Sequence, residues 1–200
     1  MKYIIHLPKD YSGKNRNHPL IFFLHGALEK GNDLNLVRKH GPVNYAEKHD
    51  DFPFIIIAPQ CALNKTWEEK ELKKLLDEII AKYRVDTSQL YCTGLSMGGF
   101  GTWKMAIKYP DLFAAIAPVC GGGNPYRAAD IKHIPAWVFH GAKDKIVPLE
   151  KSEIMVNAMK AAGAKIKFTI YPEAGHDSWS ETYNNPELYN WFLEHSLYSG

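Results

Sequence analysis

A serine set between two glycines is the residue of this 200-residue chain best suited to chemistry. The segment Gly94-Leu95-Ser96-Met97-Gly98 directly follows an apolar, strand-like run, and a helical pattern begins immediately after it. A sharp strand-to-helix turn of this kind raises a serine hydroxyl above a sheet, and its crowding requires glycine at both flanks. The N-terminus of the helix adds positive potential where an oxyanion would develop. We therefore predict that Ser96 is the nucleophile of an acyl transfer.

A serine nucleophile needs a general base, and in this arrangement the acid and then the histidine follow the serine along the chain. His176 lies in a loop after the last strand-like run, where the base must be. The chain has nine histidines, so position and not residue type selects this one. We predict His176 as the base, with activity rising at about pH 6–7 as an ordinary imidazole loses its proton.

Asp144 is the predicted acid that orients the histidine. It follows the strand-like run Ala136–Phe139, three residues after His140-Gly141. The alternatives are that Asp144 forms an Asx turn or caps the helix expected at Leu149, but it stands too early for that cap. The competing acids Asp111 and Asp130 lie on connections away from any strand end.

An oxyanion hole requires two backbone N–H groups. One should belong to Met97, the residue after the nucleophile, and the other should follow an earlier strand. After the strand-like run Leu20–Leu24, Gly26 lets the backbone approach the substrate closely. We therefore predict the Ala27 N–H as the second donor, with that of Leu28 as the alternative. His25 in the same loop could be catalytic, but we favour a histidine that braces the loop through hydrogen bonds.

The elements that must position these residues alternate along the chain. Apolar, β-branched runs predict strands at Lys2–Leu7, Leu20–Leu24, Phe54–Ala58, Gln89–Thr93, Ala114–Pro118, Ala136–Phe139 and Lys165–Tyr171. Amphipathic stretches predict helices at Glu68–Tyr83, Met97–Lys108, Leu149–Ala162 and Pro186–His195. Alternation of this kind indicates one α/β domain over residues 1–200, with a mostly parallel, doubly wound sheet of about seven strands.

Composition excludes several classes of protein. The net charge is +2, and lysines and arginines are scattered among acids, so we expect no nucleic-acid partner. No apolar run approaches the roughly 20 residues that span a bilayer, and Met1–Pro8 lacks the features of a signal peptide. We therefore expect a cytoplasmic protein with no membrane partner. The odd set Cys61, Cys92 and Cys120 favours reduced thiols.

No spacing of histidines and cysteines indicates a metal site, so we expect no metal and no cofactor. The run Gly121-Gly122-Gly123-Asn124 lacks the lysine and the following helix of a phosphate-binding loop. We interpret it as a flexible turn beside the site.

With these residues located, the chain resembles the compact α/β-hydrolase esterases often labelled "predicted peptidase" or polyhydroxybutyrate-depolymerase-like, related to feruloyl and acetylxylan esterases. The matching stretches run from Leu7 to Trp179: LPKDY, FFLHGALEKGND, IIIAPQC, YRVDTSQLYCTGLSMGGFGTW, VFHGAKDKIVP and YPEAGHDSW. The resemblance implies the same triad and oxyanion roles. Such enzymes usually have a β-hairpin before the stretch that matches Tyr3–Leu7. We therefore expect the sheet to have one strand fewer than in those enzymes. Its exposed edge strand could then pair with a second subunit, so a homodimer is possible.

The predicted function is a serine carboxylesterase for short-chain or aryl esters. The connection Val119–Pro135 is too short for a lid of several helices, so the site should be open. Aromatic and apolar side chains near it could wall a small-molecule ester pocket: Leu28, Trp67, Phe100, Tyr126 and Trp179. The alternatives are a thioesterase or acyl-protein deacylase with the same triad, a peptidase as a weaker third, and a catalytically silent hydrolase-fold binding protein.

Overall fold

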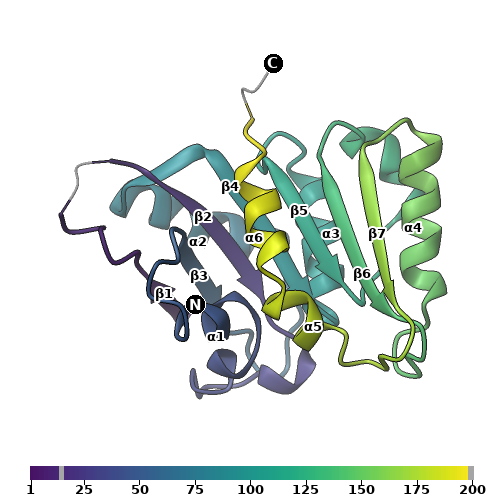
Figure 1. The fold of residues 1–200 in the computed structure, drawn as a ribbon, viewed down its shortest axis with the longest axis horizontal. Coiled ribbons are helices and arrows are strands. Elements are labelled where there is room, and N and C mark those ends of the chain that lie inside the picture. The colour runs from purple at the N-terminus through teal and green to yellow at the C-terminus, as the bar shows by residue number, and fades with distance from the viewer. Residues whose placement is uncertain (14–15, 198–200) are drawn as a thin grey trace.

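The computed structural model describes residues 1–13 and 16–197 and contains a seven-stranded sheet (Figure 1). The strand order is β1-β3-β2-β4-β5-β6-β7, and β1 alone is antiparallel to its neighbour. The strands are β1 (Tyr3–His6), β2 (His18–Leu24), β3 (Ile55–Pro59), β4 (Val85–Leu95), β5 (Ala115–Val119), β6 (Ala136–Gly141) and β7 (Ile166–Tyr171). All seven expected strands are therefore confirmed, with β1 at the sheet edge.

Helices cover both faces of this sheet, as the continuous apolar strands require. In Figure 1, α1, α5 and α6 lie in front of the sheet, and α2 and α3 lie behind it. The α-helices are α1 (Gly41–Ala46), α2 (Glu69–Lys82), α3 (Met97–Lys108), α4 (Glu150–Ala161), α5 (Trp179–Asn184) and α6 (Pro186–Leu193). Three 3-10 helices complete the described elements: η1 (Ala27–Glu29), η2 (Val37–Lys39) and η3 (Pro125–Ile131).

The core forms two layers because successive strand residues point to opposite faces. In β2, Leu20 and Phe22 pack toward α2 and α3, whereas Ile21 and Phe23 pack toward α1, α5 and α6. All four side chains are fully buried. Burial on both faces holds the strand ends in fixed register, and these ends carry the site.

The doubly wound fold and the four long helices agree with the sequence expectations, and the short helices do not. The helices α1 and α5 have six residues each, too few to show an amphipathic repeat. Trp179 is the first residue of α5. Between β5 and β6 the structure contains only a turn and η3, as the short connection predicts. Within the described residues, no helix is both long and apolar enough to cross a bilayer.

Candidate active site

Ser96 stands at the sharp turn between β4 and α3. Its backbone has φ 52° and ψ −114°, a conformation that non-glycine residues rarely adopt. The Ser96 N–H donates to the carbonyl of Val119 at 2.9 Å, which ties the turn to β5. A Cβ on Gly98 would lie 1.8 Å from the Leu24 carbonyl oxygen, and one on Gly94 would lie 2.5 Å from that of Gly98. Crowding therefore accounts for both flanking glycines.

The structure brings Ser96, His176 and Asp144 together from the ends of three strands. The Nε2 atom of His176 lies 2.9 Å from Ser96 Oγ, and its Nδ1 lies 2.7 Å from Asp144 Oδ2. The Asp144 side chain is fully buried, while that of His176 is 20% exposed. A buried carboxylate at Nδ1 leaves Nε2 free to accept a proton from the serine hydroxyl.

The other carboxylate oxygen of Asp144 forms an Asx turn. The same side chain therefore contacts His176 and also makes the turn that the sequence offered as an alternative. Its Oδ1 accepts the backbone N–H groups of Ile146 at 2.8 Å and Val147 at 2.9 Å. Burial alone would raise the pKa of this carboxyl group. The hydrogen bonds from His176 and the two N–H groups outweigh that effect, so the pKa lies below its ordinary value of 3.8. Asp144 is therefore a carboxylate at neutral pH.

His140 is a neighbour of the acid that sequence reasoning missed. It is fully buried at the end of β6, with Nε2 2.9 Å from the Val147 carbonyl oxygen and 3.2 Å from Asp144 Oδ2. Its Nδ1 lies 2.7 Å from Ser152 Oγ on α4. These contacts hold the loop that carries Asp144 against the sheet. A histidine at a strand end, four residues before the predicted acid, was the available signal.

The loop that carries Ala27 lies beside the serine because β2 and β4 are neighbours. Leu24 pairs with Gly94 in the parallel register, so both strands end at the same level. This is the switch point of the strand order, where open α/β sheets bind ligands. A Cβ on Gly26 would lie 2.7 Å from the Leu95 side chain. The assignment of Ala27 and Met97 N–H as oxyanion donors stays a prediction.

His25 braces this loop through its hydrogen bonds. Its Nε2 accepts the Cys61 N–H at 3.0 Å, and its Nδ1 lies 2.6 Å from the Gly26 carbonyl oxygen. Trp67 Nε1 donates to the His25 carbonyl at 3.1 Å. A further brace, missed from the sequence, is Gln60, whose amide donates to the Glu29 carbonyl at 2.8 Å. A ring with both nitrogens engaged in this way is not free to act as a second base.

A cleft of about 400 Å³ opens next to the serine. Its walls are Thr66, Trp67, Ser96, Met97, Phe100, Gly101 and Lys104. Of the predicted pocket residues, Trp67 and Phe100 line this cleft. Trp179 contacts the base instead, with its ring 5.2 Å from that of His176 at 88°.

Leu28 and Tyr126 lie on the surface, which corrects their placement in the wall of this cleft. Their exposures are 88% and 94%. Each sits on a 3-10 helix, and neither is among the residues that line the cleft. The glycine run Gly121–Gly123 lies beside the site as expected: a Cβ on Gly121 would lie 2.6 Å from backbone atoms of Gly99 and Phe100. The flexibility of this turn stays a prediction.

Cys120 lies beside the three residues and has an unusual backbone, with φ 40°. Cys120, Asp144 and His176 each have one atom of a kind that could bind a metal, and these three atoms lie within 4.8 Å of one another. Burial raises the pKa of the Cys120 thiol to about 12, so it is protonated at neutral pH. Asp144 and His176 in this group are already hydrogen-bonded to each other at 2.7 Å.

The family model described as "Dienelactone hydrolase family" matches residues 48–189. The chain belongs to this family. The match includes Ser96, Asp144 and His176, whereas the loop with Ala27 lies before it.

Among curated proteins, this family member is similar to poly(3-hydroxyalkanoate) depolymerase C of Paucimonas lemoignei, with 33% identity over 62% of the chain. It is also similar to the bifunctional acetylxylan esterase/xylanase XynS20E of Neocallimastix patriciarum, with 26% identity over 68% of the chain. The matches span only 31% and 21% of those relatives' lengths.

Solved structures place this family member in the α/β-hydrolase fold. A thermostable esterase matches 97% of the chain and 59% of its own chain, with a TM-score of 0.86 and 34% identity. A ferulic acid esterase matches 95% of the chain and 92% of its own, with a TM-score of 0.74. At 19% identity, the second likeness bears on the fold alone.

Proposed function

We propose that this protein is a serine carboxylesterase that hydrolyses short-chain or aryl esters. The observation that carries the proposal is the continuous hydrogen-bonded chain from Ser96 Oγ through His176 to Asp144. Such a chain supplies a nucleophile, a base and an orienting acid in one line. The thermostable esterase with 34% identity and the relatives named as esterases support the same reaction class.

The reaction proceeds in two steps. Ser96 Oγ attacks the ester carbonyl as His176 Nε2 takes its proton, and His176 then returns that proton to the leaving alcohol. Water next attacks the acyl-enzyme, again with His176 as base, and releases the acid. The N–H groups of Met97 and Ala27 hold the oxyanion in both steps.

The cleft beside Ser96 favours small or aromatic ester groups. Trp67, Met97 and Phe100 give it apolar walls, and its volume of about 400 Å³ is at the small end for ligand pockets. The short connection between β5 and β6 supplies no multi-helix cover that a long lipid would need. The substrate is therefore expected to be a short acyl or an aryl ester.

The test is hydrolysis of p-nitrophenyl esters from acetate to decanoate by the wild type, Ser96→Ala and Ser180→Ala. Ser180 is the matched control because its exposed hydroxyl bonds to Asp177. Wild type and Ser180→Ala should turn over the short esters, and Ser96→Ala should lose at least about a thousandfold. An S-aryl thioacetate, assayed in parallel, separates ester from thioester preference.

Several outcomes would contradict the proposal. Full activity in Ser96→Ala excludes Ser96 as the nucleophile. Faster turnover of decanoate than of acetate or butyrate excludes the short-chain preference. If the wild type is inactive and a fluorophosphonate also fails to label Ser96, the fold serves binding and not hydrolysis.

A further inference from the structure

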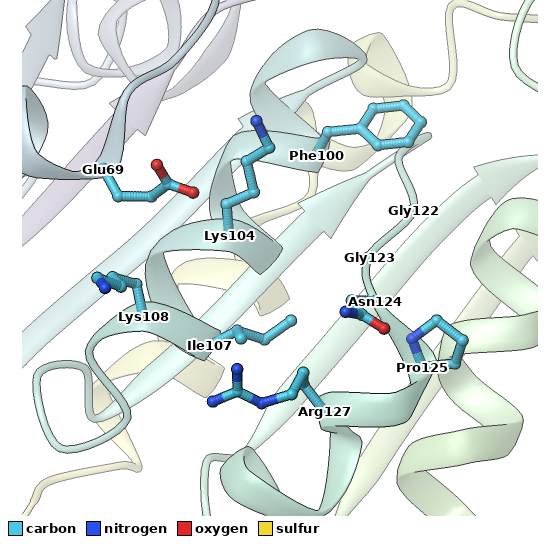
Figure 2. Close-up of a pocket in the computed structure, with 10 residues that line it drawn as sticks. All are labelled: Glu69, Phe100, Lys104, Ile107, Lys108, Gly122, Gly123, Asn124, Pro125 and Arg127. Carbon is cyan, nitrogen blue, oxygen red and sulfur yellow. The ribbon is translucent and has the colours of Figure 1, made fainter.

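A second and larger hollow lies on α3 next to the ester cleft. Its volume is about 720 Å³, and it shares Phe100 and Lys104 with the cleft that contains Ser96. Figure 2 shows the side chains of α3 on one side and Asn124 and Pro125 on the other. We call this hollow the α3 bay. Because Phe100 and Lys104 line both, the two hollows adjoin.

Cations dominate the polar wall of the α3 bay. Lys104 and Lys108 stand one turn apart on α3, and Arg127 faces them from η3 (Figure 2). Arg127 is paired with Asp130, and Glu69 is the acidic side chain in the wall. Within residues 1–13 and 16–197, neither lysine has an ion pair or a hydrogen bond through its side chain. The two ammonium groups are therefore available to a ligand.

We propose that the α3 bay is a subsite for an anionic group on a remote part of the ester substrate. This inference rests on the esterase function proposed above and specifies its substrate class: an elongated ester with a negative charge away from the reacting carbonyl. Lys104 is the link between the two hollows because it lines both. Phe100 offers an apolar ring between the ester and the charge.

The position of the lysines sets the length of the substrate. Lys104 is eight residues beyond Ser96 on α3, which is about 12 Å along the axis at about 1.5 Å per residue. Helical side chains lean toward the N-terminus, so the ammonium group lies nearer the ester than its Cα does. In Figure 2 the Lys104 side chain extends toward Phe100. A charge directly beside the ester bond would not reach it.

The test compares matched esters that differ only in a remote charge. On the acyl side, the mono-p-nitrophenyl ester of suberic acid is paired with p-nitrophenyl octanoate. On the alcohol side, the acetyl ester of a hydroxyphenylvaleric acid is paired with that of its primary amide. The readout is the ratio of kcat/KM for the anionic member to that for the neutral member. At about 0.01 M ionic strength this ratio should be about fivefold in favour of the anion in at least one pair. It should fall in 0.5 M NaCl, because the Debye length shortens from about 30 Å to about 4 Å.

Charge-reversed variants assign the effect to the bay. Lys104→Glu combined with Lys108→Glu should invert the ratio, and Glu69→Gln should raise it. The control is Lys70→Glu with Lys74→Glu, which makes the same charge change at the same spacing on α2, outside both hollows. This control should keep the wild-type ratio. An equal ratio in wild type and the Lys104/Lys108 variant, or the same loss in the control, would overturn the proposal.

Failure of the subsite and failure of the esterase function give different results. Turnover of p-nitrophenyl acetate without preference in either pair refutes the bay alone. If no ester is turned over, calorimetric binding of the same pairs to Ser96→Ala still compares the anionic with the neutral member. Tighter binding of the anion that disappears in the Lys104/Lys108 variant then supports the bay, and equal binding refutes it.

Discussion

His25 makes folding stability depend on pH in a way that can be calculated from its surroundings. The ring is 1% exposed, and burial lowers its pKa from 6.5 to about 4. The hydrogen bond to the Gly26 carbonyl opposes this shift only partly, and Lys30 adds to it. Since the Cys61 N–H donates to Nε2, a proton on Nε2 would also remove an acceptor from a buried donor.

The sign follows from which state binds the proton. Between pH 6.5 and about 4 the unfolded chain protonates this histidine and the folded protein does not, so acid favours unfolding. The full shift corresponds to about 3 kcal/mol at 1.36 kcal/mol per pKa unit. At pH 5, about 2 kcal/mol of the free energy of unfolding is lost through His25, relative to pH 7.5.

The assay is urea denaturation of wild type and His25→Gln at pH 7.5 and pH 5. The loss between the two pH values should be about 2 kcal/mol smaller in His25→Gln, because glutamine does not titrate. Gln60→Met is the matched control: it removes a hydrogen bond to the Glu29 carbonyl in the same loop and changes no titratable group. It should lower stability equally at both pH values. The same pH-dependent loss in His25→Gln as in the wild type would refute the assignment of a buried, neutral His25.

Two other predictions test the acid and the turn. Asp144→Asn should lower kcat on p-nitrophenyl acetate by roughly 10⁴-fold, because an amide stabilises the wrong tautomer of His176; a loss below about tenfold would exclude Asp144 as the orienting acid. Gly98→Ala should destabilise the fold by more than about 3 kcal/mol in thermal or urea unfolding, since its Cβ would lie 1.8 Å from the Leu24 carbonyl oxygen. At Gly163 (φ +84°) an added Cβ would meet no surrounding atom within 4 Å, so Gly163→Ala should lower the free energy of unfolding by only about 1 kcal/mol. Equal losses in the two variants would contradict the steric argument.

Local rules explain why the three central residues could be predicted from the sequence. Ser96 lies in a segment whose strand, glycines and helix are contiguous, so the turn is encoded within a few residues. Asp144 and His176 each follow a strand that the apolar pattern marks clearly. Parallel strands in one sheet end at a common edge, and the structure brings these side chains within 2.9 Å and 2.7 Å contacts there.

Contacts between segments distant in sequence could not be predicted from such local rules. Gln60 braces the Ala27 loop across 31 residues, and nothing near Gln60 in the sequence indicates its partner. The exposure of Leu28 and Tyr126 depends on which elements pack over them. Their apolar and aromatic residue types therefore wrongly suggested that both line the cleft. Lys104 and Lys108 look like ordinary solvated helix residues until η3 is placed opposite them.

The sequence by itself determined the α/β order, the strained serine turn and the strand ends that carry Asp144 and His176. It could do so because apolar period and glycine spacing are local properties of the chain. The tertiary structure decided the shape and charge of the space around Ser96. The cleft at Ser96 lies between α3 and the segment with Thr66 and Trp67, and the adjoining bay adds residues of α2 and η3. These walls exist only once the sheet brings the elements together.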